Sequence, residues 1–130
     1  MADDRFVAAS ASYAFTAHPE EVAAVRQFVG DCAESWGIDS TDVVLIASEL
    51  ATNAVLHGRT DFIVTIRRDP HVVRLEVDDR NTSGVSPLGL SPEATSGRGL
   101  ALVVALADEW GVQSRDDGKC VWTEIRLRAS

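Results

Sequence analysis

The chain has 130 residues, 45% of them hydrophobic, and a formal net charge of -8 at pH 7. This length suits one compact domain with a single core, so we expect residues 1–130 to form one domain. An acidic chain without a run of Lys or Arg repels DNA and RNA, so nucleic acid is not expected as a direct ligand. No apolar run approaches the ~18 residues of a membrane span, and the N-terminus lacks a signal-peptide pattern. These features favour a cytoplasmic protein that does not bind membranes.

The two cysteines, Cys32 and Cys120, stand alone in the sequence. Neither belongs to a CxxC motif or to a set with zinc-ligand spacing. We therefore expect both to be reduced, half-buried thiols, and we expect neither a disulfide nor a structural zinc.

The N-terminal region predicts a strand over residues 9–16 and a helix over residues 18–37. The strand residues include Tyr13 and Phe15, which fall on one face at the spacing of two that strands have. Pro19 suits the first turn of the helix, and Gly37 suits the position after its last turn.

A second helix is predicted to begin after the segment IDSTD, residues 38–42, in which Ser40 or Thr41 would be the N-terminal cap. It extends to about His57, and Gly58 is the expected C-terminal stop. At 100° per residue, four apolar residues form a narrow stripe that we expect to be buried: Val43, Ala47, Leu50 and Ala54.

Residues 61–79 predict a β-hairpin, because two alternating runs flank the turn-forming pair Asp69-Pro70. The period of two places Asp79 on the core face at the end of the second strand, and Asp78 on the opposite face. Of these two aspartates, Asp79 is the one expected to face a ligand.

The C-terminal part of the chain predicts a long loop, a short helix and two strands. Residues 80–97 are rich in Gly, Pro, Ser and Thr, and so long a loop indicates a functional lid or a disordered segment. The helix follows Gly97-Arg98-Gly99, and a DDGK turn joins the last two strands. This order predicts an α+β two-layer sandwich with the helices on one face of a mixed, mostly antiparallel sheet.

Glu49 and Asn53 lie one turn apart at the edge of the buried stripe. Such a pair is commonly a solvated helix edge. Asn is a poor helix former, however, and its carboxamide oxygen suits Mg²⁺, while a carboxylate one turn earlier could act as a general base. His57 lies near the helix C-terminus, where the dipole favours it, and we assign it no catalytic role.

Two further features have both a structural and a functional interpretation. Asp79 suits a turn at a strand end, but a carboxylate there without a donor would also accept a hydrogen bond from the exocyclic amine of adenine. Glycines around Arg98 suit a flexible joint, but at a helix N-terminus they would also let phosphate oxygens approach the free amides. Neither a P-loop nor a Rossmann fingerprint is present.

Taken together, ELATNAVLHG, VDD at a strand end and GRGL after a long loop resemble the ATP-binding boxes of the GHKL (Bergerat-fold) ATPases, which include histidine kinases, gyrase B and MutL. More narrowly, SELATNAVLHG and the C-terminal tail are similar to bacterial anti-sigma factor serine/threonine kinases of the RsbW and SpoIIAB type. The phosphoacceptor helix of histidine kinases is absent from the sequence. The resemblance covers nearly the whole chain beyond residue 10.

The resemblance implies a set of roles for the residues that match these boxes. Asn53 would bind the Mg²⁺ that bridges the ATP phosphates, Glu49 would be the general base, and Asp79 would accept from the adenine amine. An ATP lid over 80–97 would close on the phosphates together with the residues of GRGL: Gly97, Arg98, Gly99 and Leu100. The sequence departs from the family's Asp-x-Gly-x-Gly pattern, since Asp79 is followed by RNTS.

The implied function is Mg-ATP-dependent phosphorylation of a serine or threonine on an anti-anti-sigma protein of the STAS fold. Partner switching with a sigma factor would then regulate transcription. Members of the family usually dimerise, so the resemblance also implies a homodimer. The alternative is a catalytically inactive ATP-binding module that binds a protein partner without phosphoryl transfer. A detached histidine kinase domain and a scaffold that binds no nucleotide are the remaining hypotheses.

Overall fold

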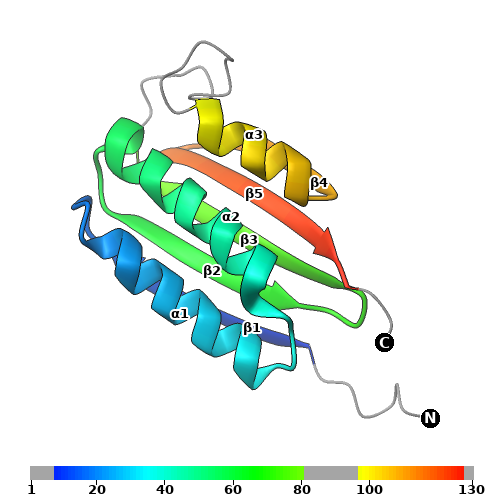
Figure 1. The fold of residues 1–130 in the computed structure, drawn as a ribbon. Coiled ribbons are helices and arrows are strands. Elements are labelled where there is room, and N and C mark those ends of the chain that lie inside the picture. The colour runs from blue at the N-terminus through cyan, green and yellow to red at the C-terminus, as the bar shows by residue number, and fades with distance from the viewer. Residues whose placement is uncertain (1–7, 81–96, 128–130) are drawn as a thin grey trace.

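The computed structural model describes residues 8–80 and 97–127, which form a helical layer on a five-stranded sheet (Figure 1). Within this part of the chain no helix is long and apolar enough to cross a lipid bilayer. The elements in chain order are β1 Ala9–Phe15, α1 Glu21–Ser35, α2 Ser40–Asn53, the π-helical turn η2 Ala54–Gly58, β2 Phe62–Arg68, β3 Val72–Asp79, α3 Gly97–Leu106, β4 Glu109–Arg115 and β5 Gly118–Arg126.

The strands are arranged in the order β1-β2-β3-β5-β4, and each of these neighbouring pairs is antiparallel. The α+β sandwich is confirmed, but the expectation of a mixed sheet is wrong for the described strands. The physical reason is the position of β5. Strands β3 and β4 run in the same direction, but β5 lies between them and pairs with both, so no two parallel strands become neighbours.

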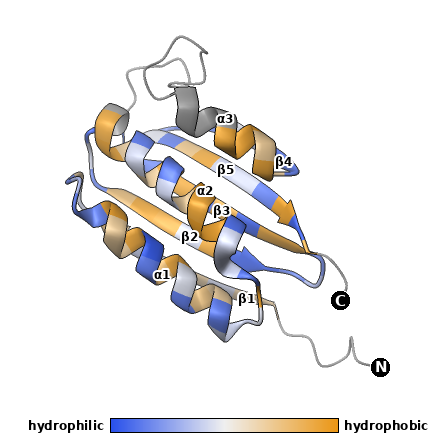
Figure 2. Cartoon of the chain, in the orientation of Figure 1, coloured by the Kyte–Doolittle hydropathy of each residue, from blue (hydrophilic) through white to orange (hydrophobic). Residues whose placement is uncertain are grey.

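Helices α1, α2 and α3 cover the same face of the sheet (Figure 1). Burial alternates strictly along β3, as its sequence predicts, with Val73, Leu75, Val77 and Asp79 on the helix side. Figure 2 shows the matching alternation of hydrophobic and hydrophilic residues in the sheet. The core lies between the two layers, and the predicted stripe of α2 is buried there: Val43, Ala47, Leu50 and Ala54.

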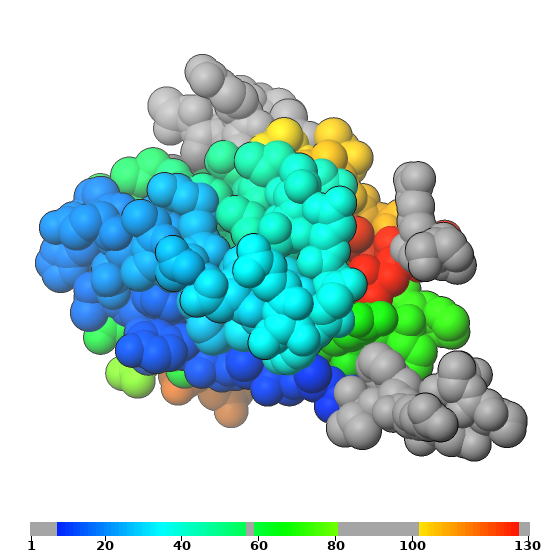
Figure 3. All heavy atoms as spheres, turned by 60° about the horizontal axis from the view of Figure 1, so that its bottom comes forward, coloured from blue at the N-terminus to red at the C-terminus, as the bar shows by residue number. Residues whose placement is uncertain are grey.

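Helices α1 and α2 pack against each other, and the space-filling view shows their side chains in contact (Figure 3). Helix α1 begins at Glu21, so the prediction that Pro19 lies in its first turn is wrong. Pro19 lies in the turn before α1, where its carbonyl accepts from the Val22 amide at 3.1 Å. Gly37 has a φ of 73° after α1, as a helix stop requires.

The N-terminal cap of α2 is Asp39, so the predicted caps Ser40 and Thr41 are wrong. A cap residue needs a non-helical backbone, and Asp39 has it, with φ -63° and ψ 120°. Its carboxylate accepts a hydrogen bond from the Thr41 amide at 3.0 Å, and this bond lowers the pKa of Asp39.

Gly118 begins β5 immediately after the two-residue turn Asp116-Asp117, and it is packed against the end of β3. A Cβ at this position would overlap the carbonyl oxygen of Asp79 and would lie 2.8 Å from the Cα of Arg80. Because these are backbone atoms, only a displacement of one strand would relieve the overlap. A glycine here therefore sets how closely β5 approaches β3.

We predict that Gly118→Ala lowers the free energy of unfolding by about 1–3 kcal/mol, the usual cost of overpacking. Gly30→Ala is the matched control, because a Cβ there meets only Val44 Cγ2 at an ordinary 3.6 Å. Replacing a glycine inside α1 should leave stability unchanged or raise it. Urea unfolding of the two variants measures both effects, and equal stability of the two would contradict the packing argument.

Candidate functional site

The elements that carry the predicted site residues meet at one edge of the sheet, the edge formed by strand ends, where α2 and β3 end and where β5 and α3 begin (Figure 1). The strand register establishes this edge. Asp79, the last residue of β3, lies opposite Phe62 at the start of β2 and opposite Lys119 near the start of β5. The turn η2, which follows α2, packs against β3. Segments far apart in the sequence therefore present their ends to the same region.

Asn53 and Glu49 lie in the last turns of α2, four residues apart and so on one side of the helix. Glu49 is half-buried, as predicted for a residue beside the apolar stripe. Asn53 is more buried than predicted, with only 7% of its surface exposed. A carboxamide at this depth must be held by polar partners or serve a ligand, because burial of an unsatisfied amide is costly.

The helical run ends at Gly58, close to the predicted stop, but directly after Asn53 it widens into the π turn η2, and the left-handed residue that follows is Arg59. The Arg59 amide donates to the Ala54 carbonyl at 2.9 Å, five residues back, and Arg59 adopts a left-handed φ of 58°. This wider turn changes the phase of residue 57, so its backbone does not continue the one-turn spacing of Glu49 and Asn53. Single π turns of this kind occur frequently at functional sites.

Asp79 lies on the helix side of the sheet at the end of β3, as predicted, and is buried. The expectation that its carboxylate has no donor is wrong. The Lys119 ammonium lies 3.1 Å from Oδ1 and 3.0 Å from Oδ2 of Asp79. Only 4% of the Asp79 side chain and 10% of the Lys119 side chain are exposed, so the two charges form a buried ion pair.

Sequence reasoning missed Lys119 because the lysine follows a turn and lysines are rarely buried. A signal was present, since Lys119 is in phase with Val121 and Thr123 and so falls on the core face of β5. Its partner could not be found this way, because only the register between β3 and β5 places Lys119 opposite Asp79. The pair offers a hydrogen-bond acceptor and a donor side by side, at no net charge.

Helix α3 includes Gly97–Leu106, so the segment Gly97-Arg98-Gly99, which the sequence places before the helix, lies in its first turn. The first four amides of a helix have no intrahelical acceptor, and the helix dipole is positive at this end. An anion is favoured at such a position. The side chains of residues 97–101, which include Arg98 and Leu100, lie outside the described part of the structure. So do residues 81–96, which make up most of the expected lid over 80–97.

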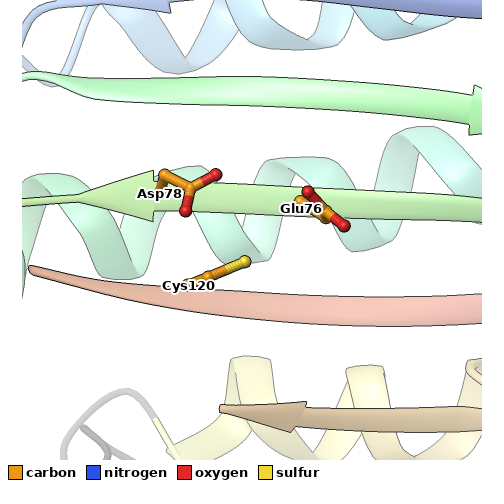
Figure 4. Close-up of side chains that lie close together, drawn as sticks. All are labelled: Glu76, Asp78 and Cys120. Carbon is orange, nitrogen blue, oxygen red and sulfur yellow. The ribbon is translucent and has the colours of Figure 1, made fainter. Parts of the chain in front are cut away.

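The opposite face of the sheet carries a second cluster, Glu76, Asp78 and Cys120, with ligand atoms within 4.8 Å of one another (Figure 4). Its carboxylates are already paired, Glu76 with Arg74 at 2.7 Å and Asp78 with Arg115 at 3.0 Å. Burial raises the pKa of the Cys120 thiol to about 11, so the thiol is protonated at neutral pH. Since metals bind the thiolate, we assign no metal to this cluster.

Both cysteines are free, as predicted, although Cys120 is fully rather than half buried. Burial is also the main reason why the pKa of Cys32 is raised. Neither thiol belongs to the edge formed by Asn53 and Asp79, because Cys120 faces away from the helices and Cys32 lies on α1.

Comparison with known proteins agrees with this geometry. The family model of the histidine kinase-like ATPase domain matches residues 15–125. The structure of the RsbU and RsbW domains of Rv1364c from Mycobacterium tuberculosis has the same fold, with a TM-score of 0.72 and 23% identity over 94% of this chain. The chain spans 34% of that longer chain. No curated protein matches it. The match over most of its length shows that the chain belongs to the family of histidine kinase-like ATPase domains.

Proposed function

We propose that the protein binds Mg-ATP at this edge of the sheet and phosphorylates a serine or threonine of a protein partner, as an anti-sigma-type kinase. The observation that supports the proposal most strongly is the packing of α2 and η2, the helical run that carries Glu49 and Asn53, against β3, the strand that ends at the buried Asp79. Membership of the ATPase family supports the nucleotide. The likeness to a chain with an RsbW domain supports the fold in which such a site would be built.

The residues present fit Mg-ATP on chemical grounds. Asn53 supplies a hard oxygen ligand of the kind that Mg²⁺ prefers, and it is buried at the helix edge rather than solvated. The free amides at the start of α3 would stabilise the phosphates, and this matters in a protein whose net charge is -8. Asp79 would accept from the adenine amine, although it shares its carboxylate with Lys119. ATP, when bound, supplies the γ-phosphoryl group, and Mg²⁺ neutralises its charge.

Glu49 would act as the general base. Its carboxylate would take the proton of the partner's hydroxyl as the hydroxyl oxygen forms a bond to the γ-phosphorus. The bond between that phosphorus and the bridging oxygen breaks, ADP leaves with the bond's electron pair, and a phosphomonoester remains on the partner. A half-buried carboxylate suits this role, since it is exposed enough to reach a protein substrate and is held in place by helix α2.

The partner that we propose is an anti-anti-sigma protein of the STAS fold, with a sigma factor as the competing partner and a second copy of the chain as a dimer partner. This choice follows from the similarity of SELATNAVLHG and the C-terminal tail to the anti-sigma kinases. Partner binding without transfer is the alternative function, and the second experiment below distinguishes it.

The magnesium assignment predicts that Asn53→Ala weakens ATP binding by at least about tenfold when Mg²⁺ is present, because a metal ligand is lost. In EDTA the variant and the wild type should bind ATP equally weakly. Thr52→Ala is the matched control, since Thr52 is adjacent on α2 and its hydroxyl bonds only locally, to the Ser48 carbonyl at 2.8 Å. Titration calorimetry with and without Mg²⁺ gives the comparison, and an unchanged affinity of Asn53→Ala would remove the assignment.

The general-base assignment predicts that Glu49→Gln lowers the rate of phosphate transfer by about 10²–10⁴-fold while ATP affinity stays within a few-fold of wild type. The assay incubates the protein with γ-labelled ATP and a STAS-fold protein encoded by a neighbouring gene. Glu34→Gln on the exposed surface of α1 is the control.

Acid-stable label on the partner would support a serine or threonine acceptor, and acid-labile label would indicate histidine instead. Wild type that binds ATP and the partner but transfers no label would favour the binding module. Normal transfer by Glu49→Gln would exclude Glu49 as the base.

A further inference from the structure

We propose that Lys119 is a specificity-determining residue of the nucleotide site: together with Asp79 it forms a donor–acceptor couple that binds the edge of the adenine base. The inference deepens the proposed function and rests on it. The sequence resemblance assigns Asp79 to the base but assigns nothing to Lys119. The structure places the two side chains together.

The couple is held in a defined geometry. Lys119 Nζ lies 3.1 Å from one oxygen of Asp79 and 3.0 Å from the other. The two residues are direct partners in the register of β3 and β5, so their side chains emerge on the same face. Gly118 keeps β5 close to the backbone of Asp79, as described above. The ammonium is therefore positioned by two strands and is not a mobile surface cation.

The remaining hydrogen-bonding capacity of the couple suits a purine. An ammonium has three donors, of which the hydrogen bond to Asp79 Oδ1 uses one, while Oδ2 lies within ion-pair distance of the same nitrogen. A carboxylate oxygen can accept more than one hydrogen bond, so a carboxylate that already has partners can also accept from a ligand amine. Adenine presents an amine donor at C6 beside acceptor nitrogens in the ring, at N1 on one side and N7 on the other. If Asp79 accepts from the amine, Lys119 is the adjacent group that can donate to one of these nitrogens.

The couple also carries no net charge, so it does not repel the negatively charged triphosphate of a nucleotide that binds to it. A lone buried carboxylate would repel the phosphates and would need a cation for burial in any case. In the free protein, Lys119 would therefore neutralise the buried Asp79. In the complex, the same pair would bind the C6 amine of the base and a neighbouring ring nitrogen.

The alternative hypothesis is that Lys119 only neutralises Asp79 and never contacts a nucleotide. The two hypotheses predict different affinities for nucleotides in which a single ring nitrogen is replaced by carbon. We would measure by calorimetry, with Mg²⁺, the affinity of the wild-type protein for ATP, 1-deaza-ATP and 7-deaza-ATP, which lack the N1 and N7 acceptors respectively. We expect one of the two analogues to bind about tenfold or more weakly than ATP, the loss typical of a hydrogen bond to a charged group.

The protein side of the experiment uses Lys119→Met, and also the double variant Asp79→Asn with Lys119→Met, which leaves no buried charge unpaired. Both variants should bind ATP about tenfold more weakly than the wild type does. Each variant should also bind the analogue to which the wild type binds weakly with the same affinity as ATP. Lys119→Arg, which keeps a donor, should retain part of the discrimination. Circular dichroism establishes that each variant is folded.

Arg115→Met is the matched control. Arg115 also pairs with a strand aspartate at 3.0 Å, Asp78, but on the opposite face of the sheet. This variant should bind all three nucleotides as wild type does. A tenfold loss of ATP affinity in Arg115→Met would show a general effect of removing a strand cation, and would overturn the proposal.

The outcomes separate this inference from the proposed function. If the wild type binds ATP and both deaza analogues equally, Lys119 does not read the base, while the ATP site stands. If one analogue is rejected equally by the wild type and by the Lys119 variants, another group contacts that nitrogen and the proposal is overturned. If the wild type binds no ATP, the proposed function fails, and this inference fails with it.

Discussion

The antiparallel pairing of β3 with β5 is the constraint on which the candidate site depends. It sets Asp79 opposite Lys119 and gives each of two buried charges the partner that it needs. Removing a charge from water costs several kcal/mol unless a partner and hydrogen bonds offset it, so neither side chain would be stable here alone. The close approach at Gly118 maintains this pairing where the strands begin and end. The position of the site is thus set by strand register rather than by any single motif.

The sheet separates two groups of ionisable side chains with different roles. On the helix side, the ion pair of Asp79 and Lys119 lies at the edge of an otherwise apolar layer, close to the end of α2. On the other side, Arg74 bonds to Glu76 and Glu124 at 2.7 and 2.8 Å and lies 4.5 Å from the centre of the Trp122 ring. Arg67 lies 3.7 Å from Glu76 and adds a second cation, so two guanidinium groups balance the two carboxylates of this partly exposed network.

Local sequence signals predicted most of the elements, and the misses have specific physical causes. The alternation in residues 61–79 identified the hairpin and the faces of Asp78 and Asp79, because strand periodicity is a property of the chain itself. The cap at Asp39 was missed because it depends on which residue adopts an extended backbone. The widening of α2 after Asn53 was missed because a five-residue hydrogen bond leaves no pattern in the sequence. The sheet was expected to be mixed, since the sequence does not state that β5 inserts between β3 and β4.

The sequence by itself determined the fold class, the buried face of each element and the candidates Glu49, Asn53 and Asp79, because these follow from periodicity and side-chain chemistry within short segments. Only the tertiary structure decided that Asp79 has a cationic partner and that α2, β3, β5 and α3 meet at one edge. The contact between residues 79 and 119 joins segments forty positions apart, and its register is set by the packing of the whole sheet. The residues around each of these two positions do not indicate such a contact, because it depends on the register in which β3 and β5 pair.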